Sequence, residues 1–184
     1  MPAARRAPRR AAAGRARAGN VHSDESVACV LDADTWTQVA ILACRVEPAT
    51  FADYVADLAG YYNAADVLVE RNNHGHLVIR ELALAGGLRL LDGYDGRPGW
   101  LSNVKGKPLL YGLLAAAVKD GACRVRDLET ANQLASIEAS TLRAPSGLHD
   151  DRADAFALAV AWQGEAVASA VVMAGDPLAE ATGW

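Results

Sequence analysis

Three carboxylates, Glu70, Asp150 and Asp151, are the residues of this sequence best suited to metal chemistry. Glu70 closes the apolar run "VLVE", and the two aspartates precede "RADAFALAVA", whose apolar residues recur at helical spacing. Carboxylate oxygens are the ligands that Mg²⁺ and Mn²⁺ prefer. Two such ions about 4 Å apart can hydrolyse a phosphodiester, because they stabilise both the attacking and the leaving oxygen. Several acids converging from different elements would therefore indicate a hydrolytic site.

Each of these acids also has an ordinary structural explanation. Asp150 and Asp151 can cap a helix and favour its positive end. Glu70 can be a solvated strand end. Spacing alone leaves both interpretations open.

Two lysines, Lys105 and Lys107, lie in the glycine-containing segment "NVKGKP" before a predicted helix. Such lysines can contact DNA phosphates, or they can simply be solvated. The three cysteines are far apart and odd in number, which indicates neither a metal knuckle nor a disulfide framework.

The elements that must position these side chains alternate between strands and helices. Residues 26–46 read as two strands joined by a turn at 32–34, and residues 47–63 as an amphipathic helix. Ala65 to Glu70 has the profile of a strand buried on both faces. A further helix begins at the two aspartates. This order predicts a layered α/β fold.

The composition indicates one globular domain with an atypical start. The chain has 184 residues, of which 52% are hydrophobic and 22% charged. Residues 1–19 hold six arginines and no acid, which leaves 12 basic and 22 acidic residues elsewhere, about −10. Such an N-terminal segment has three interpretations: a disordered basic arm that contacts nucleic acid, an organellar transit peptide, or sequence that does not belong to the fold. We expect residues 1–22 to be disordered or extraneous, residues 23–184 to form the domain, and the protein to be soluble and intracellular.

Three segments in order, "YYNAADVLVERNNHGHLVIREL", "GWLSNVKGKPLLYGLL" and "LHDDRADAFALAVA", resemble the C-terminal nuclease domain of phage terminase large subunits, the DNA-packaging motors of tailed phages. The resemblance spans residues 23–162 and implies an RNase H-like α/β fold, a mixed sheet flanked by helices. It implies a Mg²⁺- or Mn²⁺-dependent endonuclease. By position, Glu70 resembles the acid on the central strand, and Asp150 or Asp151 the late acid. Asp24, in "SDES", resembles an auxiliary acid near the metal.

The sequence departs from that family in two ways. Its members begin the domain with a strand carrying the first metal-binding aspartate, whereas "RRAAAGRARAGNVH" offers neither a strand pattern nor an acid. We therefore expect the first strand to be missing or replaced and the domain to be truncated at its N-terminus. The phosphate-binding Gly-x-x-x-x-Gly-Lys-Ser/Thr motif of the packaging ATPase is absent from this sequence, so we expect no ATP hydrolysis.

The function implied by the resemblance is cleavage of double-stranded DNA during phage packaging, in the cytoplasm of a bacterial host. Portal protein and the small terminase subunit are the implied protein partners. Two alternatives stay open: a catalytically inactive prophage remnant, and another RNase H-like nuclease such as a Holliday-junction resolvase. The Glu-Arg-Asn-Asn-His-Gly segment is not expected in a resolvase.

Overall fold

A four-stranded mixed sheet organises the residues that the computed structural model describes, which are 9–13, 25–72 and 74–162. Strands β2 (Ser26–Asp32) and β3 (Gln38–Cys44) form an antiparallel hairpin. Its turn is closed by Oδ1 of Asp32, which accepts from the backbone N–H of Asp34 at 3.3 Å and of Thr35 at 3.1 Å. The predicted hairpin is confirmed.

The strand order is β3-β2-β1-β4, so β1 (Arg9–Ala13) lies inside the sheet. It pairs antiparallel with β2 and parallel with β4 (Val67–Val69). The expectation that the N-terminal residues offer no strand is therefore wrong over Arg9–Ala13. Strands pair through backbone N–H and C=O groups. The edges of β2 and β4 that face each other offer such groups, so β1 can pair with both although its side chains show no strand pattern. The first strand is replaced by a segment without an acid.

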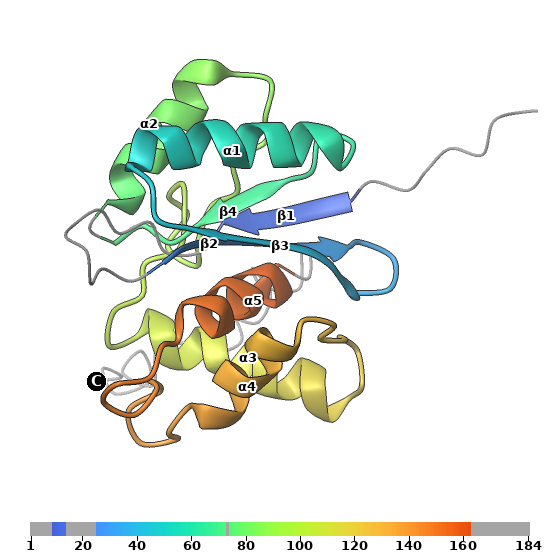
Figure 1. Ribbon diagram of the computed structural model, residues 1–184, viewed down its shortest axis with the longest axis vertical. Coiled ribbons are helices and arrows are strands. Elements are labelled where there is room, and N and C mark those ends of the chain that lie inside the picture. Colours follow the sequence, from blue (N-terminus) through green and yellow to red (C-terminus); the bar gives the residue numbers. More distant parts are fainter. Residues whose placement is uncertain (1–8, 14–24, 73, 163–184) are drawn as a thin grey trace, which may run out of the picture.

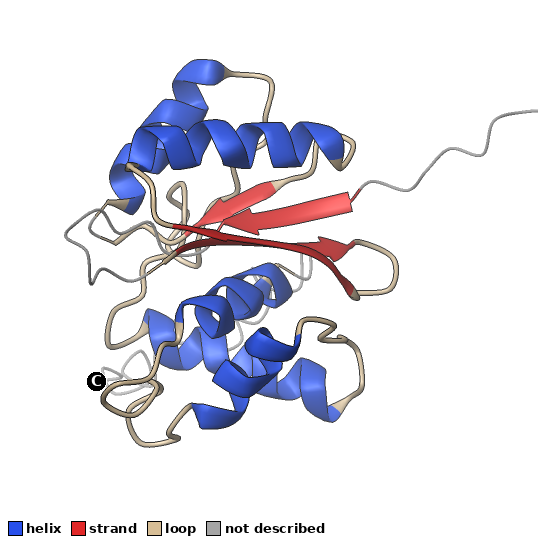
Figure 2. Cartoon of the chain, viewed as in Figure 1, coloured by secondary structure: helices blue, strands red, loops and turns tan. Residues whose placement is uncertain are grey.

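Helices cover both faces of the sheet (Figures 1 and 2). One face carries α1 (Pro48–Tyr61) and α2 (Gly75–Ala85). The other carries α3 (Gly106–Lys119), α4 (Leu128–Ser136) and α5 (Asp151–Ala161). Successive residues of a strand point to opposite faces. Accordingly, Val27, Cys29 and Leu31 of β2 join the core under α3 and α5, while Ala28 and Val30 join the core under α1 and α2.

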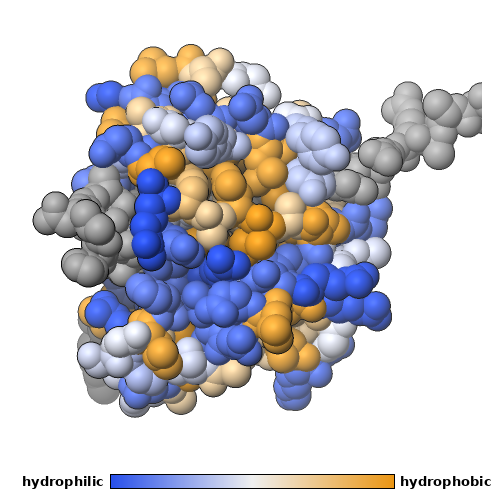
Figure 3. Space-filling view, viewed as in Figure 1, coloured by the Kyte–Doolittle hydropathy of each residue, from blue (hydrophilic) through white to orange (hydrophobic). Residues whose placement is uncertain are grey.

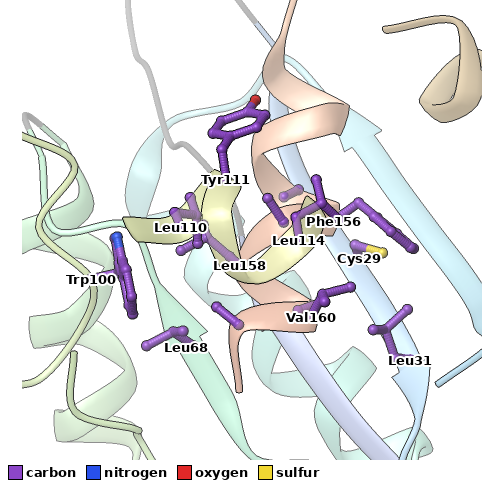
Figure 4. Packing of buried hydrophobic residues seen from close by; sticks show 14 of the residues in the cluster. Cys29, Leu31, Leu68, Trp100, Leu110, Tyr111, Leu114, Phe156, Leu158 and Val160 are labelled. Atoms are coloured by element: carbon purple, nitrogen blue, oxygen red, sulfur yellow. The ribbon is translucent and has the colours of Figure 1, made fainter. Parts of the chain in front are cut away.

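Helix α5 is enclosed by its neighbours. It packs on β2 and contacts α3 and α4, and all of its residues except Arg152 are buried. Figure 4 shows Phe156, Leu158 and Val160 among the side chains of α3 and β2. From Ala153 onward the helix is apolar on all sides except at Asp154, as is typical of a helix inside a core. The two acids of its first turn, Asp151 and Asp154, are buried with it.

The surface carries both apolar and hydrophilic side chains. Strand β3 forms an edge of the sheet, and Val39 on it is 38% exposed. Figure 3 shows apolar side chains across the middle of one face, at the level of the sheet, with hydrophilic surface beneath them. None of the helices in the described ranges is long and apolar enough to cross a membrane.

Candidate active site

Glu70 directly follows β4 and is 4% exposed. Its backbone bridges to Trp100, and Arg71 N–H donates to the Trp100 carbonyl at 2.7 Å. Its side chain is held by Asn72, whose Nδ2 donates to Oε1 of Glu70 at 3.3 Å and to the Ser102 carbonyl at 2.9 Å. An amide NH₂ has two donors, so Asn72 can bind both. Asn72 thus fixes the carboxylate against the segment that leads into α3.

The segment after Glu70 is anchored in two further ways. Arg71 is 8% exposed and forms an ion pair with Asp95. Burial opposes the ionisation of Asp95, but the hydrogen bond and charge of Arg71 outweigh it and hold the pKa of that carboxyl below its usual value. Gly75, at the start of α2, lies so close to Glu70 that an added Cβ would be 1.8 Å from the Glu70 carbonyl oxygen. Only glycine permits this approach.

The start of α5 supplies the other acids. Asp150 is the N-cap residue, and its side chain is 13% exposed, whereas the side chain of Asp151 is 3% exposed. His149 Nδ1 lies 3.9 Å from Oδ2 of Asp151. Both predicted aspartates thus stand at the edge of the core with their helix, and they are not solvated caps.

Asp154 is a fourth acid that sequence reasoning missed. Its side chain is 4% exposed; Oδ1 accepts from the Tyr111 hydroxyl at 2.7 Å and Oδ2 from Lys107 Nζ at 3.2 Å. Burial raises the pKa of Asp154; the charge of Lys107 opposes the rise and that of Asp150 adds to it. The sequence signal was its spacing of four from Asp150, which places both on one helical face.

The Tyr111 hydroxyl donates to Asp154 and lies within the electrostatic influence of Asp150 and Glu70. Burial raises the pKa of Tyr111, and the negative charges of Asp154, Asp150 and Glu70 raise it further. Figure 4 shows this hydroxyl directed away from Leu110 and Leu114. The acid after β4 and the acids of α5 therefore act electrostatically on one group, although eighty residues separate Glu70 from Asp150.

Lys107 lies within this cluster. Its Nζ is 3.6 Å from Oδ2 of Asp150 as well as 3.2 Å from Asp154, and its side chain is 14% exposed. Lys105 is exposed at the N-cap of α3, where Oδ1 of Asn103 accepts from the backbone N–H groups of Lys105 and Gly106 at 3.0 and 2.8 Å. The two predicted lysines thus differ: Lys107 engages the acids and Lys105 faces solvent.

A hollow of about 630 Å³ opens beside Lys107. It lies between residues 102–108 and 139–143; the described residues that line it include Ser102, Thr141 and Arg143, and none of them carries a carboxylate. Arg143 was not predicted. Arg143 and the hydroxyls of this lining are groups that can bind an anion, whereas the Lys107 ammonium pairs with Asp150 and Asp154.

The acids supply the hard oxygen ligands that Mg²⁺ and Mn²⁺ prefer, from two separate elements. Among the described residues, no group of three or more His, Cys, Asp or Glu side chains is gathered closely enough to hold an ion. Asp24, the auxiliary acid inferred from the sequence, lies outside the described residues. The donor chemistry fits a divalent cation, with Glu70, Asp150 and Asp151 as the candidate ligands.

Solved structures share this fold. The large terminase nuclease from thermophilic phage G20c with bound magnesium is 22% identical over 85% of this chain and 88% of that one, with a TM-score of 0.66. The large terminase nuclease domain of Thermus phage P74-26 is 22% identical over 88% and 89%, with a TM-score of 0.63. The human cytomegalovirus terminase nuclease domain is 12% identical over 88% and 85%, with a TM-score of 0.53.

No protein-family model and no curated protein matches the sequence. At these identities the solved structures show the fold. The expected RNase H-like mixed sheet flanked by helices is confirmed.

Proposed function

We propose that this chain is the metal-dependent nuclease domain of a phage DNA-packaging terminase large subunit and that it cleaves double-stranded DNA. The observation that carries the proposal is geometric: Asn72 ties Glu70 to Ser102, just before α3, and Lys107 of α3 pairs with Asp150 and Asp154, in a fold shared with terminase nucleases. One of those nucleases was solved with magnesium and another form with cobalt. Mg²⁺ or Mn²⁺ is the cofactor we propose here.

Glu70, Asp150 and Asp151 would hold the ion, and Asp24 is a further candidate ligand. A bound divalent cation would supply stabilisation of the negative charge that develops on the phosphate. Asn72 orients Glu70 by its 3.3 Å hydrogen bond. Lys107 lies between Asp150 and Asp154, where its positive charge reduces the repulsion between the two side chains.

The hollow beside Lys107 is the surface we propose for a DNA phosphate. Arg143 and Lys107 line it, and Lys105 is exposed nearby in sequence. Phosphate contacts supply most of the affinity for nucleic acid. Local cations are needed here because the chain outside residues 1–19 carries an excess of acid. We further propose that the domain acts in the cytoplasm of a bacterial host, with portal protein and the small terminase subunit as its protein partners.

Strand β1 contributes no acid, because its sequence is RRAAA. The resemblance to terminase nucleases implies a metal-binding aspartate on the first strand, and β1 does not supply one. Glu70, Asp150, Asp151 and Asp24 would have to suffice. An inactive remnant would have the same fold and would not cleave.

Nicking of supercoiled plasmid in Mn²⁺ tests the proposal. We expect Glu70→Ala and Asp151→Ala to lower the nicking rate at least about 100-fold, because each removes a proposed ligand. Asp57→Ala, an exposed acid on α1, is the matched control and should nick as the wild type does. Nicking that survives both site substitutions would contradict the site. A wild-type chain that does not nick would favour the inactive remnant.

A further inference from the structure

Helix α5 begins without help from its own N-cap side chain. The first N–H groups of a helix have no acceptor within it and normally bond to the N-cap residue. Asp150 holds that position, but its side chain accepts no capping hydrogen bond. Oε1 of Gln133, on α4, accepts instead from the backbone N–H of Arg152 at 2.8 Å and of Ala153 at 3.4 Å. These are the second and third helical residues, the amides that an N-cap side chain would bind.

We infer that Gln133 is a positioning residue of the nuclease site, because it caps α5 from a neighbouring helix and leaves the Asp150 carboxylate to face Lys107. The inference rests on the proposed function, in which Asp150 and Asp151 hold the ion. The Asp150 carboxylate lies 3.6 Å from Lys107 Nζ. A carboxylate folded back onto the amides of Arg152 and Ala153 would be withdrawn from that contact.

A neutral capping group is favourable beside the acids at the start of α5. Gln133 is 7% exposed and offers a neutral amide oxygen, so it adds no negative charge beside Asp150, Asp151 and Asp154. A glutamate at this position would keep the acceptor. It would also bury one more carboxylate next to the acids, at a cost in repulsion.

Helix α4 is itself fixed to the sheet and to α5, so the cap has a defined position. Nε2 of Gln38, the first residue of β3, donates to Oγ1 of the buried Thr130 at 3.4 Å. Arg152 Nη1 donates to Oδ2 of Asp127 at 3.3 Å. One contact therefore joins α4 to the sheet and the other joins its N-cap to α5, so the position of Gln133 relative to the α5 amides is fixed.

Three variants of the full chain test the inference. Gln133→Met keeps the side-chain length and removes the acceptor, while Gln133→Glu keeps an acceptor. Ser136→Ala is the matched control, because the Ser136 hydroxyl donates to the Gln133 backbone carbonyl at 2.8 Å, within α4. Binding of Mn²⁺ alone is measured by calorimetry, at a temperature where circular dichroism shows every variant folded. Hydrogen exchange of the Arg152 and Ala153 amides is followed by NMR.

We expect Gln133→Met to weaken Mn²⁺ binding by about 10- to 100-fold, the usual effect of losing a group that orients a metal ligand. The Arg152 and Ala153 amides should exchange faster in the same variant. Gln133→Glu should recover part of the binding, and Ser136→Ala should bind as the wild type does.

Two results would overturn the inference while leaving the proposed function intact. The first is equal Mn²⁺ affinity in wild type and Gln133→Met, which would reduce the cap to a structural contact. The second is unchanged amide exchange. A wild-type chain that binds no Mn²⁺, or that still binds after Asp151→Asn, would overturn the proposed function and the positioning role together.

Discussion

Lys107 forms an ion pair with Asp154, a buried acid of α5. Its Nζ reaches Asp154 at 3.2 Å, and the Asp154 side chain is 4% exposed. Removing one partner of a buried ion pair leaves an uncompensated charge in the core, whereas replacing both partners can be nearly neutral. The pair is therefore accessible to a double-mutant cycle.

We expect Lys107→Met to lower the free energy of unfolding by about 3 kcal/mol, near the lower end for a broken buried pair because Lys107 keeps some exposure. The double variant Lys107→Met with Asp154→Asn should recover most of that loss, since no buried charge is left. Urea unfolding followed by circular dichroism measures both. A double variant as unstable as the sum of the single variants would contradict the pairing.

Glu70, Asp150 and Asp151 could be proposed from the sequence because each borders a clear apolar pattern. Asp154 lies inside an apolar run, and only its contacts with Tyr111 and Lys107 mark it as part of the site. Sequence also could not decide whether Lys107 faces a phosphate or a carboxylate, because that depends on how α3 packs against α5.

At the level of elements, the turn between β4 and α2 depends on a close backbone contact at Gly75. We expect Gly75→Ala to destabilise the fold by about 3 kcal/mol, since its Cβ would meet the Glu70 carbonyl, a backbone atom that cannot move aside easily. Thermal unfolding measures the change.

Gly60→Ala, within α1, is the control for Gly75. An added Cβ there meets nothing within 4 Å, so alanine should stabilise the helix by up to about 1 kcal/mol. If both alanine variants behave alike, the close contact at Gly75 has no energetic role.

Helix α4 has a pH-sensitive cap at Asp127. Burial opposes ionisation of this carboxyl, but hydrogen bonds from Thr130 and the charge of Arg152 outweigh it, so its pKa lies below the ordinary value. A lowered folded pKa stabilises the fold above the unfolded pKa, near 3.9, and that stabilisation is lost as the pH falls through the folded pKa.

Asp127→Asn keeps a capping oxygen but cannot titrate. We therefore expect the wild type to be more stable than Asp127→Asn at about pH 6, with the difference shrinking between about pH 5 and pH 3. Urea unfolding at several pH values measures it. A constant difference across that range would show that Asp127 does not contribute to the acid sensitivity.

Sequence patterns located most elements, including the β2–β3 hairpin, α1 and the start of α5. They missed β1, whose residues have no alternation of apolar and polar side chains. Strand formation depends on tertiary context as well as on intrinsic propensity. A segment of alanine and arginine can therefore pair where neighbouring strands leave backbone groups unpaired.

For the molecule as a whole, β1 joins the hairpin to β4. We expect Ala12→Pro to lower the melting temperature by more than about 10 °C, since proline has no N–H and is found essentially only on edge strands. Ala12→Gly keeps the N–H and should cost much less. Equal melting temperatures for the wild type and Ala12→Pro would show that β1 does not support the sheet.

Trp100 gives the molecule an optical reporter at the junction of its two halves. It is 1% exposed, its indole N–H donates to the Gly106 carbonyl at 3.1 Å, and its backbone N–H donates to Val69 at 2.7 Å. The indole of Trp100 therefore contacts the residue just before Lys107, and its backbone contacts the residue just before Glu70. In a variant whose other three tryptophans are replaced by phenylalanine, its emission, quenched or shifted when water enters, would register a separation of the β4 end from α3 in real time.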